Sequence, residues 1–434
     1  MNWKKEPLGK ICKTTSGGTP SRKNQSYYQN GTIPWVKSGE LENNIITTSE
    51  EFITEEGLLN SSAKIFPAGT LLIALYGATI GKLAFLGIDA ATNQAVCGIF
   101  QNENVSLKYL YYYLLFQRPN LIKQGVGGAQ PNISQTILKK LEISYPDSIT
   151  EQQRIVARIE ELFSELDKAV DTLKTTKEQL AVYRQAVLKS AFEGKYTIDW
   201  RKSNDCSVDN DYLKIKKNNQ IFKDTSGDEN ELILKIPNTW MKVRFGEIFD
   251  VEVGATPSRQ HKEYWNGKIA WVSSGEVRFE SINRTHEMIT QHGLNNSSTN
   301  LQPIGTVLLA MIGEGKTRGQ AAILNIPAAH NQNTAAILVS RTPCQPKYVY
   351  YFLQLNYENT RRVGSGNNQK ALNKERVRAI RFPFAPVEEQ VAIVKEIDER
   401  LSVCDSIEKT VDAALAQADA MRQSILKQAF ERTL

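Results

Sequence analysis

Polar residue clusters that occur twice along the chain are its best candidates for binding chemistry. A Thr-Pro-Ser-Arg segment at residues 19–22 recurs at 256–259, and an Asn-Gln pair at 93–94 recurs at 331–332. Hydroxyl groups beside an arginine suit phosphate oxygens, and Asn or Gln amides can hydrogen-bond an adenine edge at two points. The candidate DNA-binding residues are Thr19, Ser21, Arg22, Lys23, Lys37, Lys82, Asn93, Gln94 and Gln130 in the first copy, and Thr256, Ser258, Arg259, Ser273, Lys316, Arg318, Asn331, Gln332, Asn368 and Lys370 in the second.

Each cluster taken alone also has a structural interpretation. Ser, Thr and Pro are common in turns, and an Asn-Gln pair often caps buried backbone. The net charge of +6 is modest, but the basic excess lies in residues 1–149 and 236–387, while 150–193 and 388–434 are acidic. Charge alone favours phosphate contact over a merely solvated surface only slightly. The recurrence of the clusters in both basic blocks is what favours DNA.

Signatures of catalysis are weak. Residues 310–317 fit a relaxed phosphate-binding loop, but the next residues predict a strand where a helix must begin, and the first copy lacks the pattern. A glycine-rich hairpin with a basic tip fits better. All four histidines lie in the second copy, so a repeated His base or metal ligand is not expected. Glu40 and Glu276 recur, but beside a segment typical of a strand end and turn. We expect no catalytic residue, no metal site and no enzyme activity.

A tandem duplication positions these clusters. Trp3 recurs as Trp240, and the Glu-Gln pair at 151–152 recurs at 389–390. Two copies of a long repeat exclude a solenoid and predict a pseudo-two-fold molecule, for which duplex DNA is the commonest matching ligand. Each block has the pattern of a mixed α and β domain. The expected elements are strands at 70–76 and 306–312, tyrosine-rich helices at 108–117 and 347–354, and closing strands at 141–146 and 380–386.

A long amphipathic helix follows each block. Residues 150–193 contain no Gly or Pro, and their apolar residues recur in steps of three and four, the heptad pattern of a coiled coil. The same register runs through 388–431. A helix of about 44 residues spans roughly 65 Å and needs a partner for its apolar face, and the second helix is the obvious one. The expected fold is α+β, with mixed α/β domains at 1–149 and 236–387, helices at 150–193 and 388–434, and an irregular, mobile linker at 194–235.

The composition fits a cytoplasmic protein. Hydrophobic residues make up 41% of the chain, enough for ordinary cores, and the longest apolar run, residues 71–76, is too short to cross a membrane. Residues 1–10 lack the apolar segment of a signal peptide. Five scattered cysteines without a CxxC pair argue against disulfides and zinc.

Several of the repeated segments resemble the DNA-specificity (S) subunits of type I restriction–modification enzymes. These segments are Glu-Gln-x-x-Ile-Val at 151–156 and 389–394, Arg-Gln-Ala-Val-Leu-x-x-Ala-Phe-Glu-Gly-Lys at 184–195 followed by Trp200-Arg201, Pro-Asn-Thr-Trp at 237–240, and Gly-Gly-Thr-Pro-Ser at 17–21. Together they are specific to the family, and the resemblance covers essentially the whole chain.

The resemblance implies two target-recognition domains held apart by two helices that pack as an antiparallel coiled coil. Each domain is then expected to read one half of a bipartite site in double-stranded DNA. The S subunit of this family has no catalytic site and binds no cofactor itself. It docks two modification subunits, which bind S-adenosylmethionine and methylate adenine, and restriction subunits, which use ATP and Mg²⁺.

Two other classes of function stay open from the sequence alone. One is a two-headed scaffold whose blocks bind protein or glycan. The other is a P-loop NTPase or nuclease that uses the loop at residues 313–317.

Differences between the copies indicate which residues discriminate DNA sequence. If the two half-sites differ, residues identical in both blocks cannot account for the difference. We therefore expect the Ser-Arg pair of each repeated segment to position the DNA backbone. We expect discrimination from divergent positions, such as Lys37 against Ser273 and residues 78–80 against 314–318.

Overall fold

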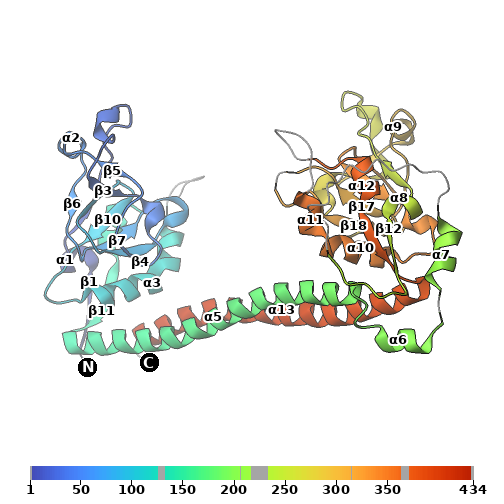
Figure 1. Ribbon diagram of the computed structural model, residues 1–434. Coiled ribbons are helices and arrows are strands. Elements are labelled where there is room, and N and C mark those ends of the chain that lie inside the picture. Colours follow the sequence, from blue (N-terminus) through green and yellow to red (C-terminus); the bar gives the residue numbers. More distant parts are fainter. Residues whose placement is uncertain are drawn as a thin grey trace. The chain divides into compact units, whose positions relative to one another are not determined.

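The computed structural model describes residues 2–125, 132–205, 207–216, 233–313, 315–362 and 371–431. Contacts divide the chain into two compact units, unit 1 (Met1–Thr175 with Val411–Leu434) and unit 2 (Thr176–Thr410). Each unit contains one copy of the repeated block and one part of each long helix, as the labelled elements of Figure 1 show.

Unit 1 is built on a five-stranded sheet with the strand order β2-β10-β7-β8-β4. Its central strand β7 (Leu71–Ala74) is buried on both faces. Leu71 and Ile73 join one apolar cluster, whereas Leu72 and Ala74 join another. Side chains of a strand alternate between its faces, so a strand covered on both sides must be a continuous apolar run.

The remaining elements of unit 1 surround this sheet. The strands are β1 (Trp3–Pro7), β2 (Thr14–Ser16), β3 (Ile33–Val36), β4 (Asn44–Ile46), β5 (Phe52–Ile53), β6 (Ile65–Phe66), β8 (Leu83–Leu86), β9 (Ala90–Thr92), β10 (Val96–Ile99) and β11 (Glu142–Pro146). The helices are α1 (Leu8–Ile11), α2 (Glu55–Leu59), α3 (Leu107–Gln124) and α4 (Gln135–Lys140), with 3-10 turns η1 (Gln25–Tyr27), η2 (Ser38–Glu40) and η3 (Gly77–Thr79).

Unit 2 repeats this topology. Its five-stranded sheet has the order β13-β20-β17-β18-β15, with antiparallel pairs throughout except for the parallel β15–β18 pair, which matches the parallel β4–β8 pair of unit 1. A smaller sheet, β16-β14-β19, corresponds to β5-β3-β9. The predicted tandem of mixed α/β domains is therefore confirmed.

The elements of unit 2 follow the same sequence along the chain. The strands are β12 (Met241–Arg244), β13 (Val251–Val253), β14 (Trp265–Val272), β15 (Ser281–Ile282), β16 (Glu287–Ile289), β17 (Val307–Ala310), β18 (Ala321–Leu324), β19 (Ala328–His330), β20 (Thr334–Ile337) and β21 (Arg381–Phe384). The helices are α8 (Phe245–Ile248), α9 (Gln291–Asn295), α10 (Pro346–Leu355), α11 (Tyr357–Arg362) and α12 (Lys374–Ala379), with 3-10 turns η5 (Lys262–Tyr264), η6 (Ser274–Glu276) and η7 (Val339–Arg341).

Two helices of 44 residues each, α5 (Ile149–Phe192) and α13 (Val387–Phe430), follow the two sets of strands. The sequence predicted both helices, because the spacing of their apolar residues continues without a Gly or Pro to interrupt it. Gly194 stops the first helix with a φ of +67°, where a Cβ would lie 2.5 Å from Pro237 Cγ. The first and last residues that the sequence predicts for each whole domain stay a prediction.

Within unit 2 the two helices run antiparallel. Lys177 contacts Glu408 at 3.9 Å, and Arg184, further along α5, contacts Asp405 at 2.7 Å. The partners on α13 therefore move backward as α5 moves forward. This is the packing expected for the two apolar seams.

Each long helix ends in an aromatic cluster. In unit 1, Phe430 of α13 packs against Tyr109 and Tyr113 of α3, with ring centroids 5.4 and 5.1 Å apart. In unit 2, Phe192 of α5 lies 4.9 Å from the ring of Tyr348 of α10. All of these rings are buried, so the tyrosine-rich helix of each block anchors a helix end.

The prediction of an irregular linker is wrong for the part that the structure describes. This part forms two short helices, α6 (Ile198–Ser203) and α7 (Val208–Ile215). Val208 joins the core of unit 2, and the Asp211 carboxylate accepts a hydrogen bond from the backbone N–H of Val387 at 3.0 Å, at the start of α13. Polar composition suggested disorder because the few residues that dock are spread among charged ones. Residues 217–232 lie outside the described part.

Candidate nucleic-acid interface

The fold brings the Thr-Pro-Ser-Arg segment and the Asn-Gln pair together in both units. The Thr19 hydroxyl donates a hydrogen bond to Gln94 Oε1, and the Thr256 hydroxyl donates to Gln332 Oε1 at 2.6 Å. In unit 2 the close approach of these two segments depends on Gly254, two residues before Thr256. A Cβ on Gly254 would lie only 1.9 Å from a backbone oxygen of the neighbouring strand, so only glycine fits there.

The Asn of each Asn-Gln pair has a structural role, as the alternative interpretation expected. Asn93 Oδ1 accepts the backbone N–H of Ala95 at 3.2 Å, and Asn331 Oδ1 accepts that of Asn333 at 3.1 Å. Asn331 is buried, whereas Gln94 and Gln332 are exposed. In unit 2 the glutamine is therefore the member of the pair that a ligand can reach, and in unit 1 it is the more exposed member.

Both arginines of the repeated segment are bound within the domain. Arg22 pairs with Glu51 at 2.6 Å, and its guanidinium lies 4.4 Å from the ring centroid of Tyr28. Lys37 shares the same carboxylate at 3.0 Å, so two predicted DNA-binding residues are joined through one acid. Burial is the largest single effect on the pKa of Glu51 and raises it, but the hydrogen bonds and charges of Lys37 and Arg22 together outweigh burial and hold this pKa below its ordinary value.

The second unit repeats the arrangement. Arg259 makes a two-point contact with Glu287, one arm of which is 2.8 Å, and its guanidinium lies 3.8 Å from the ring centroid of Trp265. The hydrogen bond from Arg259 lowers the pKa of Glu287. Two N–H groups of this stacked guanidinium are held by the carboxylate, and the side chain stays exposed to solvent.

Other predicted residues lie close to these segments. Ser21, Lys23 and Ser258 are exposed, and the carbonyl of Ser258 accepts the indole N–H of Trp265 at 3.2 Å. Ser273, the counterpart of Lys37, donates its hydroxyl to Glu276 at 2.9 Å in a capping box at the start of η6.

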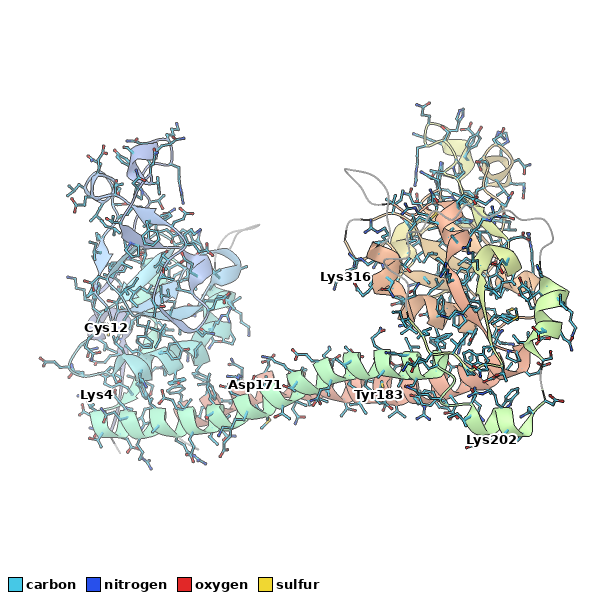
Figure 2. All side chains as sticks on the ribbon, in the orientation of Figure 1. Lys4, Cys12, Asp171, Tyr183, Lys202 and Lys316 are labelled. Atoms are coloured by element: carbon cyan, nitrogen blue, oxygen red, sulfur yellow. The ribbon has the colours of Figure 1, made fainter. Side chains whose placement is uncertain are left out.

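Lys82, Lys316 and Arg318 lie apart from these segments, at the tips of the β7–β8 and β17–β18 hairpins. The antiparallel pairing of β17 with β18 confirms the predicted glycine-rich hairpin, and no helix begins at Lys316 as a phosphate-binding loop would require. Lys316 is labelled in Figure 2. Gln130, Asn368 and Lys370 lie outside the described residues.

Sequence reasoning missed three residues that organise these surfaces: Glu51, Glu287 and Arg118. The two glutamates precede an Ile-Thr step that recurs in both copies, so the repeat itself held a signal for them. Arg118 has no basic counterpart at the matching position of the second copy, and no comparable signal pointed to it.

Residues of the described ranges form no group of three His, Cys, Asp or Glu side chains that could hold a metal ion. Among the described helices, none is long and apolar enough to cross a membrane. His330 is buried, and burial lowers its pKa to about 4. Its Nδ1 lies 2.7 Å from Thr334 Oγ1, which places it in the core of unit 2 and not at a surface site.

Two copies of one framework, each presenting exposed polar side chains on fixed loops, define a recognition protein. The sequence matches the family described as "Type I restriction modification DNA specificity domain" over residues 1–180 and 237–417, and the chain belongs to this family. Its members are recognition subunits and carry no catalytic site of their own.

Among named relatives, the chain is similar to the specificity subunit of the type I restriction enzyme EcoR124I/EcoR124II from Escherichia coli. They are 32% identical over 161 residues, which cover 36% of this chain and 39% of the relative. It is also similar to the MjaIX specificity subunit from Methanocaldococcus jannaschii, with 29% identity over 278 residues, 62% of this chain and 57% of the relative. Both matches thus span less than two thirds of the relative's length.

A solved structure shares the fold over the whole chain. It was determined to explain complex assembly and conformational transition of the type I R-M system, and it matches with a TM-score of 0.72 and 17% identity. The match covers 100% of this chain and 98% of that one.

Proposed function

We propose that this chain reads double-stranded DNA for a type I restriction–modification complex, with each block recognising one half of a bipartite site. The repeated framework is the observation that carries this proposal. Both units hold a Thr–Gln hydrogen bond and an arginine–glutamate pair at equivalent places, while exposed residues beside them differ. Two readers of unlike half-sites need a constant frame and variable contacts. We assign the readers to residues 1–149 and 236–387.

The long helices are proposed to dock two modification subunits. In unit 2, Val182, Val391 and Val403 expose 70%, 52% and 60% of their surface on α5 and α13. Aliphatic side chains left in solvent along a helix pair suit a protein partner. In this proposal the modification subunits bind S-adenosylmethionine, restriction subunits use ATP and Mg²⁺, and the assembly works in the cytoplasm.

Sequence discrimination is proposed to come from positions where the copies differ. Lys37 and Ser273 occupy equivalent positions at the starts of η2 and η6 but present different chemistry, a cation against a hydroxyl. Arg318 has no counterpart in the first copy. Replacement of Arg318 by Ala should relax specificity in one half-site only, and equal weakening on all sequences would contradict that assignment.

Sequencing of modified adenines tests the function. A cell that carries this gene and its modification subunit should methylate a split motif, and deletion of the gene should remove that motif and no other. Restoring the gene on a plasmid is the matched control. An unchanged pattern of methylation after deletion would falsify the proposal.

A further inference from the structure

Among the described residues, the tip of the β17–β18 hairpin in unit 2 collects positive charge that no acid neutralises; Glu314 of the same loop lies outside the described residues. Arg361 of α11 donates through Nη2 to the carbonyl of Gly315 at 2.7 Å and through Nη1 to Tyr357 Oη at 2.9 Å. Tyr357 in turn donates to the carbonyl of Lys316. Arg318 donates to the carbonyl of Arg361 at 2.7 Å. All of these acceptors are uncharged.

The Lys316 ammonium is exposed at this tip. Within the described residues it has no carboxylate partner, and neither have Arg318 and Arg361. Lys316 and Arg318 of the hairpin and Arg361 of α11 are therefore gathered at one tip, and no carboxylate among the described residues compensates their charges. Like charges placed together in this way are costly unless an anion joins them.

Unit 1 builds an equivalent tip from different residues. Arg118 of α3 donates from Nε to the carbonyl of Ile80 at 3.2 Å, and its side chain lies against Gly81. Lys82 follows directly in the chain. Neither cation has an acidic partner among the residues that the structure describes. Among the described residues only Nε of this guanidinium has a partner, so its two terminal nitrogens are available to a ligand.

The repeated Thr-Pro-Ser-Arg segments differ in this respect. Arg22 and Lys37 face Glu50 and Glu51, and Arg259 faces Glu287, so the local charge of each is balanced. A neutralised arginine releases no counterion from DNA unless its own ion pair first breaks. A cation without a carboxylate partner has no ion pair to break before it contacts a phosphate.

We propose that the two hairpin tips, and not the repeated arginines, make the phosphate contacts of this chain with duplex DNA. The tip of unit 2 contributes Lys316 and Arg361, and the tip of unit 1 contributes Lys82 and Arg118. Tyr357 positions the unit 2 tip by donating a hydrogen bond to the carbonyl of Lys316. Arg318 links the tip to α11 by donating to the carbonyl of Arg361. This inference rests on the proposed function and adds where the DNA backbone lies on each domain.

The test measures how the affinity of the full chain for a random-sequence DNA duplex depends on salt. Phosphate contact is sequence-independent, so the recognised motif need not be known. Lys316→Gln, Arg361→Gln, Lys82→Gln and Arg118→Gln should each reduce the slope of log affinity against log salt by about 0.9, which is about an eightfold loss at about 0.1 M salt. Lys316→Gln removes a side chain without partners in the described part of the chain, so it leaves the fold intact.

The double variant Arg259→Gln/Glu287→Gln is the matched control, because it keeps the net charge and lies in the same unit. Its slope should equal that of the parent. Arg361→Lys retains the charge but not the two-point grip, and it should keep most of the slope that Arg361→Gln loses.

A parent that binds while Lys316→Gln and Arg361→Gln keep the full slope overturns the inference alone. The same holds if the control double variant loses as much slope as they do. A parent chain that does not bind duplex DNA at all overturns the proposed function as well.

Discussion

We expect the largest single effect on the stability of unit 2 when the Glu389 carboxylate loses its positive partner. It is fully buried near the start of α13, where it accepts hydrogen bonds from Thr197 Oγ1 at 2.6 Å and Trp240 Nε1 at 2.8 Å. Arg201 of α6 supplies the only positive partner among the described residues, at 2.5 Å. Arg201→Met would keep much of the apolar stem and leave the carboxylate buried without its counter-charge.

The expected cost follows from burial. Removal of one partner from a buried ion pair typically costs about 3–5 kcal/mol. For a unit of this size, 1 kcal/mol shifts the melting temperature by about 2–4 °C, so the transition of unit 2 should fall by roughly 6–20 °C. The repeat provides a control, because Glu151 at the matching position of α5 pairs with the exposed Arg154. Arg154→Met should leave the melting temperature unchanged.

Scanning calorimetry of the full chain measures this, with Arg201→Met, Arg154→Met and the double variant Arg201→Met/Glu389→Gln side by side. Since glutamine removes the buried charge, the double variant should recover part of the loss. A fall of less than about 2 °C for Arg201→Met, or no recovery in the double variant, would refute the electrostatic explanation.

Three further predictions concern the same framework. Burial lowers the pKa of His330 to about 4, so as the pH falls from 6.5 the unfolded chain takes up a proton before the folded chain does, and the free energy of unfolding decreases. His330→Thr introduces the residue that the first copy has at this position. In urea titrations between about pH 6.5 and 4, this variant should show a weaker dependence of the free energy of unfolding on pH. Gly194→Ala should lower the urea midpoint of unit 2, because its φ is positive and a Cβ would meet Pro237; an unchanged midpoint would contradict this. Phe430→Ala should destabilise unit 1 by about 3–5 kcal/mol, and thermal unfolding that shows no such loss would contradict the packing argument.

The long helices, the duplication and the hairpin could be predicted because their signals are local. The apolar period of α5 and α13 continues for 44 residues, and no Gly or Pro interrupts it. The docking of the linker could not be predicted, since it depends on single side chains such as Asp211, which caps a helix 176 residues away in sequence.

The residues of the candidate site could be predicted from the sequence, but the ion pairs that balance their charges could not. The Thr–Gln contact joins segments that recurrence had already selected. Arg22, however, is separated from Glu51 by the strands β3 and β4 and the turns η1 and η2, and nothing in the amino-acid types shows that the two residues meet. Arg118 reaches its hairpin from a helix whose sequence suggested only a tyrosine-rich core.

The division of the chain into units also constrains the order of folding. Unit 2 is one continuous stretch, Thr176–Thr410, whereas unit 1 joins Met1–Thr175 to Val411–Leu434. During synthesis the first block leaves the ribosome early but lacks the last turns of α13, including Phe430, until the end. The second block can therefore complete its core first, and the first block must wait for a segment encoded more than two hundred codons later.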